Sequence, residues 1–160
     1  MNSMDQDTLF GSQYKIARMN ADIAEKLLAK ALKDMQDGDC FSCIKLFTNS
    51  IKCSRAAIDY CRDKKNFEKL GEMHRNAVSI YVAGRLNRGK ILAKINLYDL
   101  AFKDLHFVIS GCDEQKLIGE AYEATSLMVE DICDQYDNPE DGEIKAELSK
   151  LRAYVESELI

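Results

Sequence analysis

The residues of this chain best suited to chemistry are an amide and two ammonium groups that share one helical face. Asn87, Lys90 and Lys94 follow one another at spacings of three and four, which aligns them on one side of an α-helix. Lysines donate hydrogen bonds and carry positive charge, and the asparagine amide both donates and accepts. Together the three groups would suit a carboxylate, a peptide C-terminus or backbone carbonyls. The alternative is a solvated helix face, because lysines are usually exposed.

No residue pattern in the sequence is typical of an enzyme. Serine, histidine, cysteine and aspartate do not occur in an arrangement that indicates nucleophilic catalysis, and no glycine-rich phosphate loop is present. Cys40 and Cys43 form a single CxxC, but zinc needs four ligands and no second CxxC or HxxxH completes the set. Cys43, Cys53 and Cys61 lie among apolar neighbours and are expected to act as small core residues. We therefore expect a non-enzymatic protein without a cofactor or a metal ion.

The charges of the chain raise nucleic-acid binding as an alternative function. The 160 residues carry a net charge of −5, with the basic excess up to residue 110 and the acidic excess beyond it. Basic residues gather in two clusters, which are Arg62, Lys64, Lys65, Lys69 and Arg85, Arg88, Lys90, Lys94. No nucleic-acid-binding motif accompanies them, and a pI near 5.1 opposes contact with a polyanion. We therefore expect no nucleic-acid partner.

The elements that must position these residues are predicted to be helices. Apolar residues recur at spacings of three, four and seven, the period of amphipathic α-helices, and no strand pattern of useful length appears. In the first helix, seven residues belong to this apolar face, which are Ile16, Ile23, Leu27, Leu28, Ala31, Leu32 and Met35. We expect residues 1–13 to form a flexible N-terminal tail and residues 14–160 a single helical domain. The pattern predicts six helices in three antiparallel pairs, over about residues 14–35, 44–61, 67–95, 98–110, 114–135 and 143–160.

Three residues have a predicted role in ending or packing these helices. Gly38 follows the first apolar stripe and can take the left-handed conformation that ends a helix. Gly89 lies inside the third helix, where it costs up to about 1 kcal/mol relative to alanine. We expect Gly89 to allow close approach of a neighbouring helix, and Asn96 to end the third helix.

Two segments share a pattern of small and large residues. Residues 39–51 and 97–109 each follow a turn and carry a small residue, a large apolar residue four positions later and a smaller residue three positions after that. A small residue at the first position lets the second helix of a pair approach the first. The residues are Cys43, Phe47 and Ser50 in one segment and Ala101, Leu105 and Val108 in the other.

At these residues the chain resembles tetratricopeptide repeat proteins, over about residues 20–135. The first repeat lacks the usual proline after Cys53, and the third shows no small-residue signature in its second helix. The resemblance implies an all-α fold of antiparallel helix hairpins in a right-handed superhelix of about three repeats. The alternative is an unrelated six-helix bundle. Segment 84–110 carries the best match, in which the family positions are filled by Asn87-Arg88-Gly89, Leu92, Tyr98, Ala101, Asp104 and Leu105.

The resemblance also implies a binding groove, because the first helix of each pair lines the concave surface of such a stack. We therefore expect an adaptor that docks a peptide or helix of a partner protein, with an acidic or carboxylate-bearing segment. Only Asn87 matches the five residues with which several family members clamp chaperone C-terminal tails, so we expect weak binding or none to such tails. In the middle repeat the family pattern places six residues on the lining, which are Ala83, Leu86, Asn87, Lys90, Ala93 and Lys94.

A narrower resemblance concerns Asn87 to Leu105, followed by Gly111-Cys112-Asp113 and Lys116-Leu117. This run is similar to the N-terminal repeats of SET- and MYND-domain proteins, which are lysine methyltransferases. The chain shows no MYND zinc array and lacks the length for a SET domain. The resemblance therefore implies a repeat module of such a protein or a standalone relative.

The remaining expectations concern self-association and location. The apolar side of the predicted last helix, with Leu148, Leu151, Val155 and Leu159, could pair with another copy in a homodimer. Residues 1–8 are polar and acidic and do not resemble a secretory signal. No stretch approaches the roughly 20 apolar residues of a membrane span. We expect a cytoplasmic protein, with the nucleus as the alternative.

Overall fold

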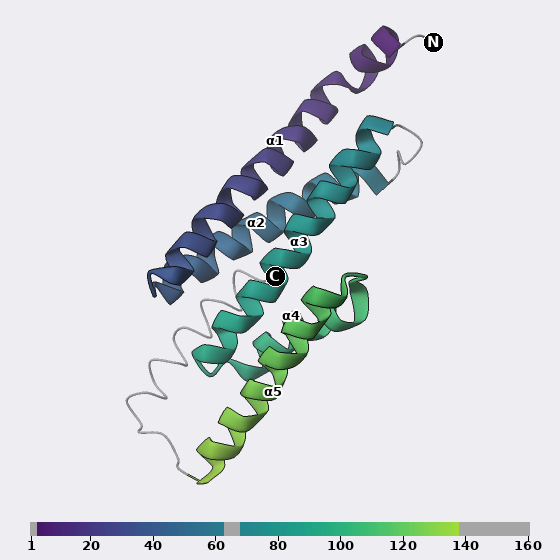
Figure 1. Cartoon of the computed structure of the whole chain (residues 1–160). Coiled ribbons are helices and arrows are strands. Elements are labelled where there is room, and N and C mark those ends of the chain that lie inside the picture. Colours follow the sequence, from purple (N-terminus) through teal and green to yellow (C-terminus); the bar gives the residue numbers. More distant parts are fainter. Residues whose placement is uncertain (1–2, 63–67, 138–160) are drawn as a thin grey trace.

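The computed structural model describes the backbone of residues 3–62 and 68–137, and the side chains of residues 11–62 and 70–135. These residues form five α-helices and no strand, so the predicted all-α fold is confirmed (Figure 1). The predicted sixth helix, residues 143–160, and its apolar residues lie outside the described residues. None of the described helices has an apolar stretch long enough to cross a bilayer. The helices are α1 Ser3–Gln36, α2 Cys40–Arg62, α3 Glu68–Lys94, α4 Tyr98–Gly111 and α5 Gln115–Asp137.

α1 begins at Ser3, whereas the first helix was predicted to begin at about residue 14. The prediction relied on the polar composition of residues 1–13 and on Gly11. A single glycine costs a helix only about 1 kcal/mol relative to alanine. A helix of 34 residues that also contacts α2 and α3 tolerates that cost.

α1 packs on α2 through small side chains. Ala17, Ala21, Ala24 and Ala31 are buried, and the Ser50 hydroxyl of α2 donates a hydrogen bond of 2.7 Å to the Ala24 carbonyl. Alanine leaves little bulk between two helices, so the backbones come close together. The two helices therefore form a tightly packed hairpin.

This packing overturns one prediction about α1. Ile16, Ile23 and Leu32 were expected to face inward, but they are 60%, 42% and 37% exposed. The close approach of α2 selects the alanine face of α1, and the larger apolar residues lie beside that face.

The turns between the helices follow local backbone chemistry. Gly38 has the expected left-handed conformation, with φ of 85°, and Asn96 has φ of 66° at the predicted end of α3. α2 begins at Cys40 instead of residue 44, because the Asp39 carboxylate accepts a 3.0 Å hydrogen bond from the Ser42 amide. Such a capping contact stabilises the first turn of a helix.

α3 is the central helix of the described chain, because it contacts each of the other four. α1 pairs with α2 and α3 pairs with α4 across short turns. α1 and α3, the first helices of the two described pairs, also touch. α3 in turn contacts α5, and the three helices follow one another on one face (Figure 1). Phe47 of α2, Leu92 of α3 and Ala101 of α4 are fully buried in a core shared by the two pairs. The face made by α1, α3 and α5 is called the three-helix face below.

Candidate functional site

Gly89 fixes the distance between α3 and α4. A Cβ atom at this position would lie 3.0 Å from two side-chain carbons of Leu105 and 3.1 Å from the Cβ atom of Asp104. The predicted close approach at Gly89 is therefore confirmed. It brings the Asp104 carboxylate of α4 against the two arginines of α3.

Arg88 and Asp104 form a buried bidentate ion pair. The Arg88 Nε atom donates a 2.7 Å hydrogen bond to Asp104 Oδ2, and its Nη2 atom donates a second, also of 2.7 Å, to Oδ1. Thr48 of α2 accepts a third bond of 3.3 Å from Nη1. Arg88 is only 5% exposed, so its charge is satisfied inside the protein.

Arg85 completes the same network from one turn earlier. Its Nε atom donates a 2.8 Å hydrogen bond to Asp104 Oδ1, and its Nη1 atom donates one of 3.0 Å to the Tyr81 hydroxyl. The guanidinium carbon also lies 4.4 Å from the centre of the Phe107 ring, which favours a cation–π contact. One carboxylate thus holds two arginines.

This network engages two of the four cations of one predicted basic cluster. Arg85 and Arg88 bind Asp104, which leaves Lys90 and Lys94 as the cationic groups of that cluster that face solvent. The other cluster cannot be assembled from the described side chains, because Lys64 and Lys65 and the side chain of Lys69 lie outside them. Nothing in the described part therefore favours nucleic-acid binding.

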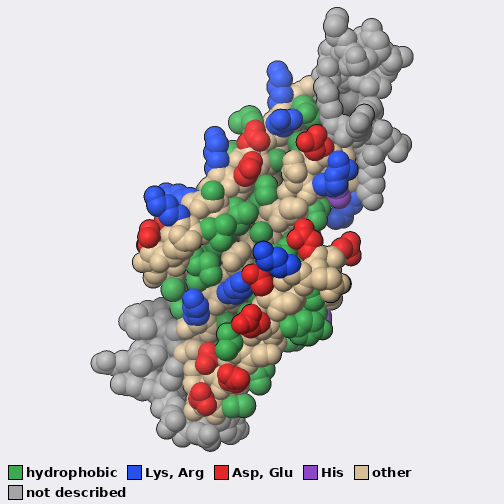
Figure 2. All heavy atoms as spheres, viewed as in Figure 1, with side chains coloured by type: hydrophobic (Ala, Val, Ile, Leu, Met, Phe, Trp, Pro, Cys, Tyr) green, Lys and Arg blue, Asp and Glu red, His purple; other side chains and the backbone are tan. Residues whose placement is uncertain are grey.

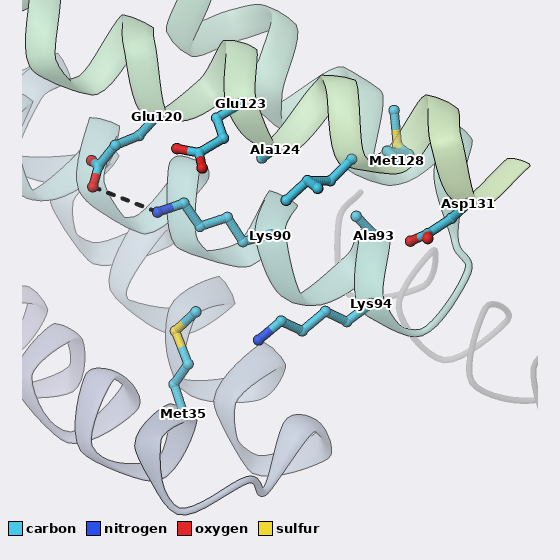
Figure 3. Close-up of a pocket in the computed structure, with 10 residues that line it drawn as sticks. Met35, Lys90, Ala93, Lys94, Glu120, Glu123, Ala124, Met128 and Asp131 are labelled. Carbon is cyan, nitrogen blue, oxygen red and sulfur yellow. Dashed lines mark ion pairs between the residues drawn. The ribbon is translucent and has the colours of Figure 1, made fainter.

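A pocket with a volume of about 470 Å³ lies between α3 and α5 on the three-helix face, and α1 closes one end of it (Figure 3). Its apolar lining combines one residue of α1 with residues of α3 and α5, and its rim carries charges of both signs. The lining residues are Met35, Lys90, Ala93, Lys94, Glu120, Glu123, Ala124, Leu127, Met128 and Asp131.

Charges on the two sides of the pocket are opposite in sign. α3 contributes Lys90 and Lys94, and α5 contributes Glu120, Glu123 and Asp131. Lys90 Nζ lies 3.7 Å from Glu120 Oε1, and both side chains are partly exposed. Figure 2 shows a line of basic groups across the middle of the molecule, with acidic and hydrophobic groups together on the α5 side of it.

Of the predicted site residues, Lys90 and Lys94 line this pocket. Ala83 is half-buried one turn before Asn87. The Asn87 amide donates a 2.8 Å hydrogen bond to the Ala83 carbonyl within α3, so it is engaged by its own helix. Leu86 does not line this pocket and is only 1% exposed. It packs among Leu105, Val108 and Ala121 of α4 and α5, which cover that side of α3.

The acidic wall of the pocket was missed at the level of sequence. Glu120, Glu123, Leu127 and Asp131 follow one another at spacings of three, four and four, which aligns them on one helical face. The same reasoning that aligned Asn87 with the two lysines could have found this face of α5. Residue spacing could not show that the acidic face of α5 lies across a pocket from the lysines of α3.

The cysteines are free thiols and range from buried to exposed. Burial raises the pKa of the Cys43 thiol to about 11, and the nearby Cys40, Asp34 and Asp39 add to the effect. The Cys43 thiol donates a weak hydrogen bond of 3.5 Å to the Ala31 carbonyl. The described residues contain no cluster of three or more His, Cys, Asp or Glu side chains that could hold a metal ion.

Comparison of the chain with models of protein families, with curated proteins and with solved structures gave no match. The resemblance to tetratricopeptide repeat proteins therefore depends on the quoted residues alone and stays a prediction. The same holds for the resemblance to SET- and MYND-domain proteins.

Proposed function

We propose that this protein is a non-enzymatic interaction module that docks a peptide or helix of a partner protein on the three-helix face. The pocket between α3 and α5 carries the proposal, because it combines an apolar lining with charged groups on both of its sides. Leu127 in this pocket is 55% exposed, and an exposed apolar group gains free energy when a partner covers it.

The order of the helices supports a stack of hairpins of the tetratricopeptide type. Short turns join α1 to α2, α3 to α4 and α4 to α5. α1 contacts α3, and α3 contacts α5. In such a stack the first helices of the pairs line the concave surface. The pocket, with Lys90 and Lys94 on its α3 side, then belongs to that surface.

A charge reversal at Lys94 tests the proposal, because Lys94 is exposed and its loss leaves the core intact. The variant Lys94→Glu and the matched control Lys45→Glu, on the exposed side of α2, are immobilised beside the wild-type protein. Partners are captured from cell extract and identified by mass spectrometry. We expect a set of proteins retained by wild type and Lys45→Glu and lost by Lys94→Glu, with equal melting temperatures. Equal capture by all three would contradict the proposal.

Chaperone C-terminal tails are expected to bind weakly or not at all. Only one of the five clamp residues is present, and the carboxylates of Glu123 and Asp131 would repel an acidic tail. Calorimetry with a synthetic chaperone tail peptide measures this directly. Low-micromolar binding would overturn this expectation.

A further inference from the structure

We infer that the pocket between α3 and α5 selects a segment in which an apolar side chain stands between an acidic and a basic one, in preference to a wholly acidic segment. The inference rests on the proposed function and names the chemistry of the partner. It replaces the simpler expectation, drawn from the lysines alone, of an acidic or carboxylate-bearing partner.

The charged groups that line the pocket have a negative sum. Two ammonium groups face three carboxylates, so the lining as a whole is negative. Lys90 is already 3.7 Å from Glu120, and that contact offsets one charge of each sign. Lys94, Glu123 and Asp131 remain, and the described residues supply none of them with an ion-pair partner within 4.0 Å. A wholly acidic segment would gain one favourable contact there and meet two repulsive ones.

The remaining positive and negative groups lie on opposite sides of the pocket. Figure 3 shows the Lys94 side chain directed toward Met35 of α1, whereas Glu123 and Asp131 extend from α5 on the other side of the pocket. A bound segment therefore meets a positive charge along α3 and negative charges along α5. Opposite charges on a bound segment would fix its direction as well as its position.

The apolar lining determines what lies between the two charges. Ala93, Ala124, Leu127 and Met128 form a surface without hydrogen-bonding side chains, so an apolar group of the partner fits there. Arginine suits the acidic side better than lysine. Its aliphatic stem can lie on the exposed Leu127 side chain while its planar head binds a carboxylate with two hydrogen bonds.

The experiment selects peptides without assuming a partner. A phage library of random ten-residue peptides is panned on the immobilised full chain, and enriched sequences are synthesised and titrated by fluorescence anisotropy. We expect peptides with an acidic residue and an arginine on either side of an apolar residue. Asp131→Lys should weaken such a peptide about tenfold, because it removes a charge-assisted hydrogen bond and adds repulsion. Asp134→Lys, an exposed neighbour outside the pocket, should leave the affinity unchanged.

A compensating change sharpens the test. Replacing the arginine of the selected peptide by glutamate should restore binding to Asp131→Lys and abolish binding to the wild-type protein. Enrichment of wholly acidic peptides whose binding depends on Lys94 but not on Asp131 would overturn the inference and leave the proposed docking function standing. If no enriched peptide is affected by Lys94→Glu or by Asp131→Lys, both the inference and the proposed function are wrong.

Discussion

Asp104 is expected to be the most sensitive single position in the described chain. Its carboxylate accepts three charge-assisted hydrogen bonds, one from Arg85 and the bidentate pair from the nearly buried Arg88. The variant Asp104→Ala leaves the Arg88 guanidinium in place with Thr48 as its remaining hydrogen-bond partner. Arg85 is partly exposed and can turn toward water, so the main cost falls on Arg88.

Breaking a buried ion pair by removing one partner costs about 3–5 kcal/mol, because a buried charge is left without compensation. A single domain is usually stable by only about 5–15 kcal/mol. With a urea m-value of about 2 kcal/mol per molar, a loss of about 4 kcal/mol lowers the unfolding midpoint by about 2 M. The assay is urea unfolding followed by circular dichroism of the helices.

Two further variants separate the ion pair from other effects. Asp59→Ala removes an exposed carboxylate of α2 and should shift the midpoint little. Arg88→Met combined with Asp104→Leu removes both buried charges and should recover most of the lost stability, since apolar groups often replace a buried pair at little cost. The reasoning is refuted if Asp104→Ala behaves like Asp59→Ala, or if the double variant is as unstable as the single one.

Three other results are expected. Gly89→Ala should destabilise the protein by about 1–2 kcal/mol, because the added Cβ atom would crowd Leu105. Gly119→Ala, where the added Cβ atom would have no neighbour within 4 Å, should stabilise the protein by up to about 1 kcal/mol. Melting temperatures of the two variants that move in the same direction would contradict this. Iodoacetamide at pH 8 should label exposed Cys133 and spare Cys43, which is buried and has a pKa of about 11, as read by mass spectrometry. The unfolded chain loses the Cys43 proton near pH 8.5 and the folded protein near pH 11. The free energy of unfolding should therefore fall as the pH is raised between these two values, and it should fall less in the variant Cys43→Ala.

The helix ends that depend on neighbouring residues were predictable, and those that depend on packing were not. Gly38 and Asn96 take left-handed conformations that local chemistry favours, so the ends of α1 and α3 follow from the sequence. The start of α1 at Ser3 could not be predicted from the sequence, because polar composition and one glycine do not decide whether a long helix continues. Of the buried alanines of α1, only Ala31 was placed on the apolar face, since close packing favours small residues over the large ones that dominate an apolar pattern.

The α3 side of the pocket could be predicted from the sequence, whereas the position of α5 opposite it could not. Spacing alone aligned Lys90 with Lys94, and both line the pocket. The burial of Leu86 could not be predicted, because α3 is covered on most sides by four helices and its sequence pattern does not show which face stays open. The burial of Arg88 depends on Asp104, which lies 16 residues further along the chain and reaches it only through the fold.

The central position of α3 determines how the described chain comes apart. In a simple linear stack each hairpin can open independently of those beyond its neighbours. Here α3 touches all four other helices, so the amides in its middle turns become accessible to solvent only when every layer around it has separated. Their exchange with deuterium therefore reports the global free energy of unfolding. Among the described helices α5 contacts α3 and α4 alone, so its amides are expected to exchange at a lower free energy.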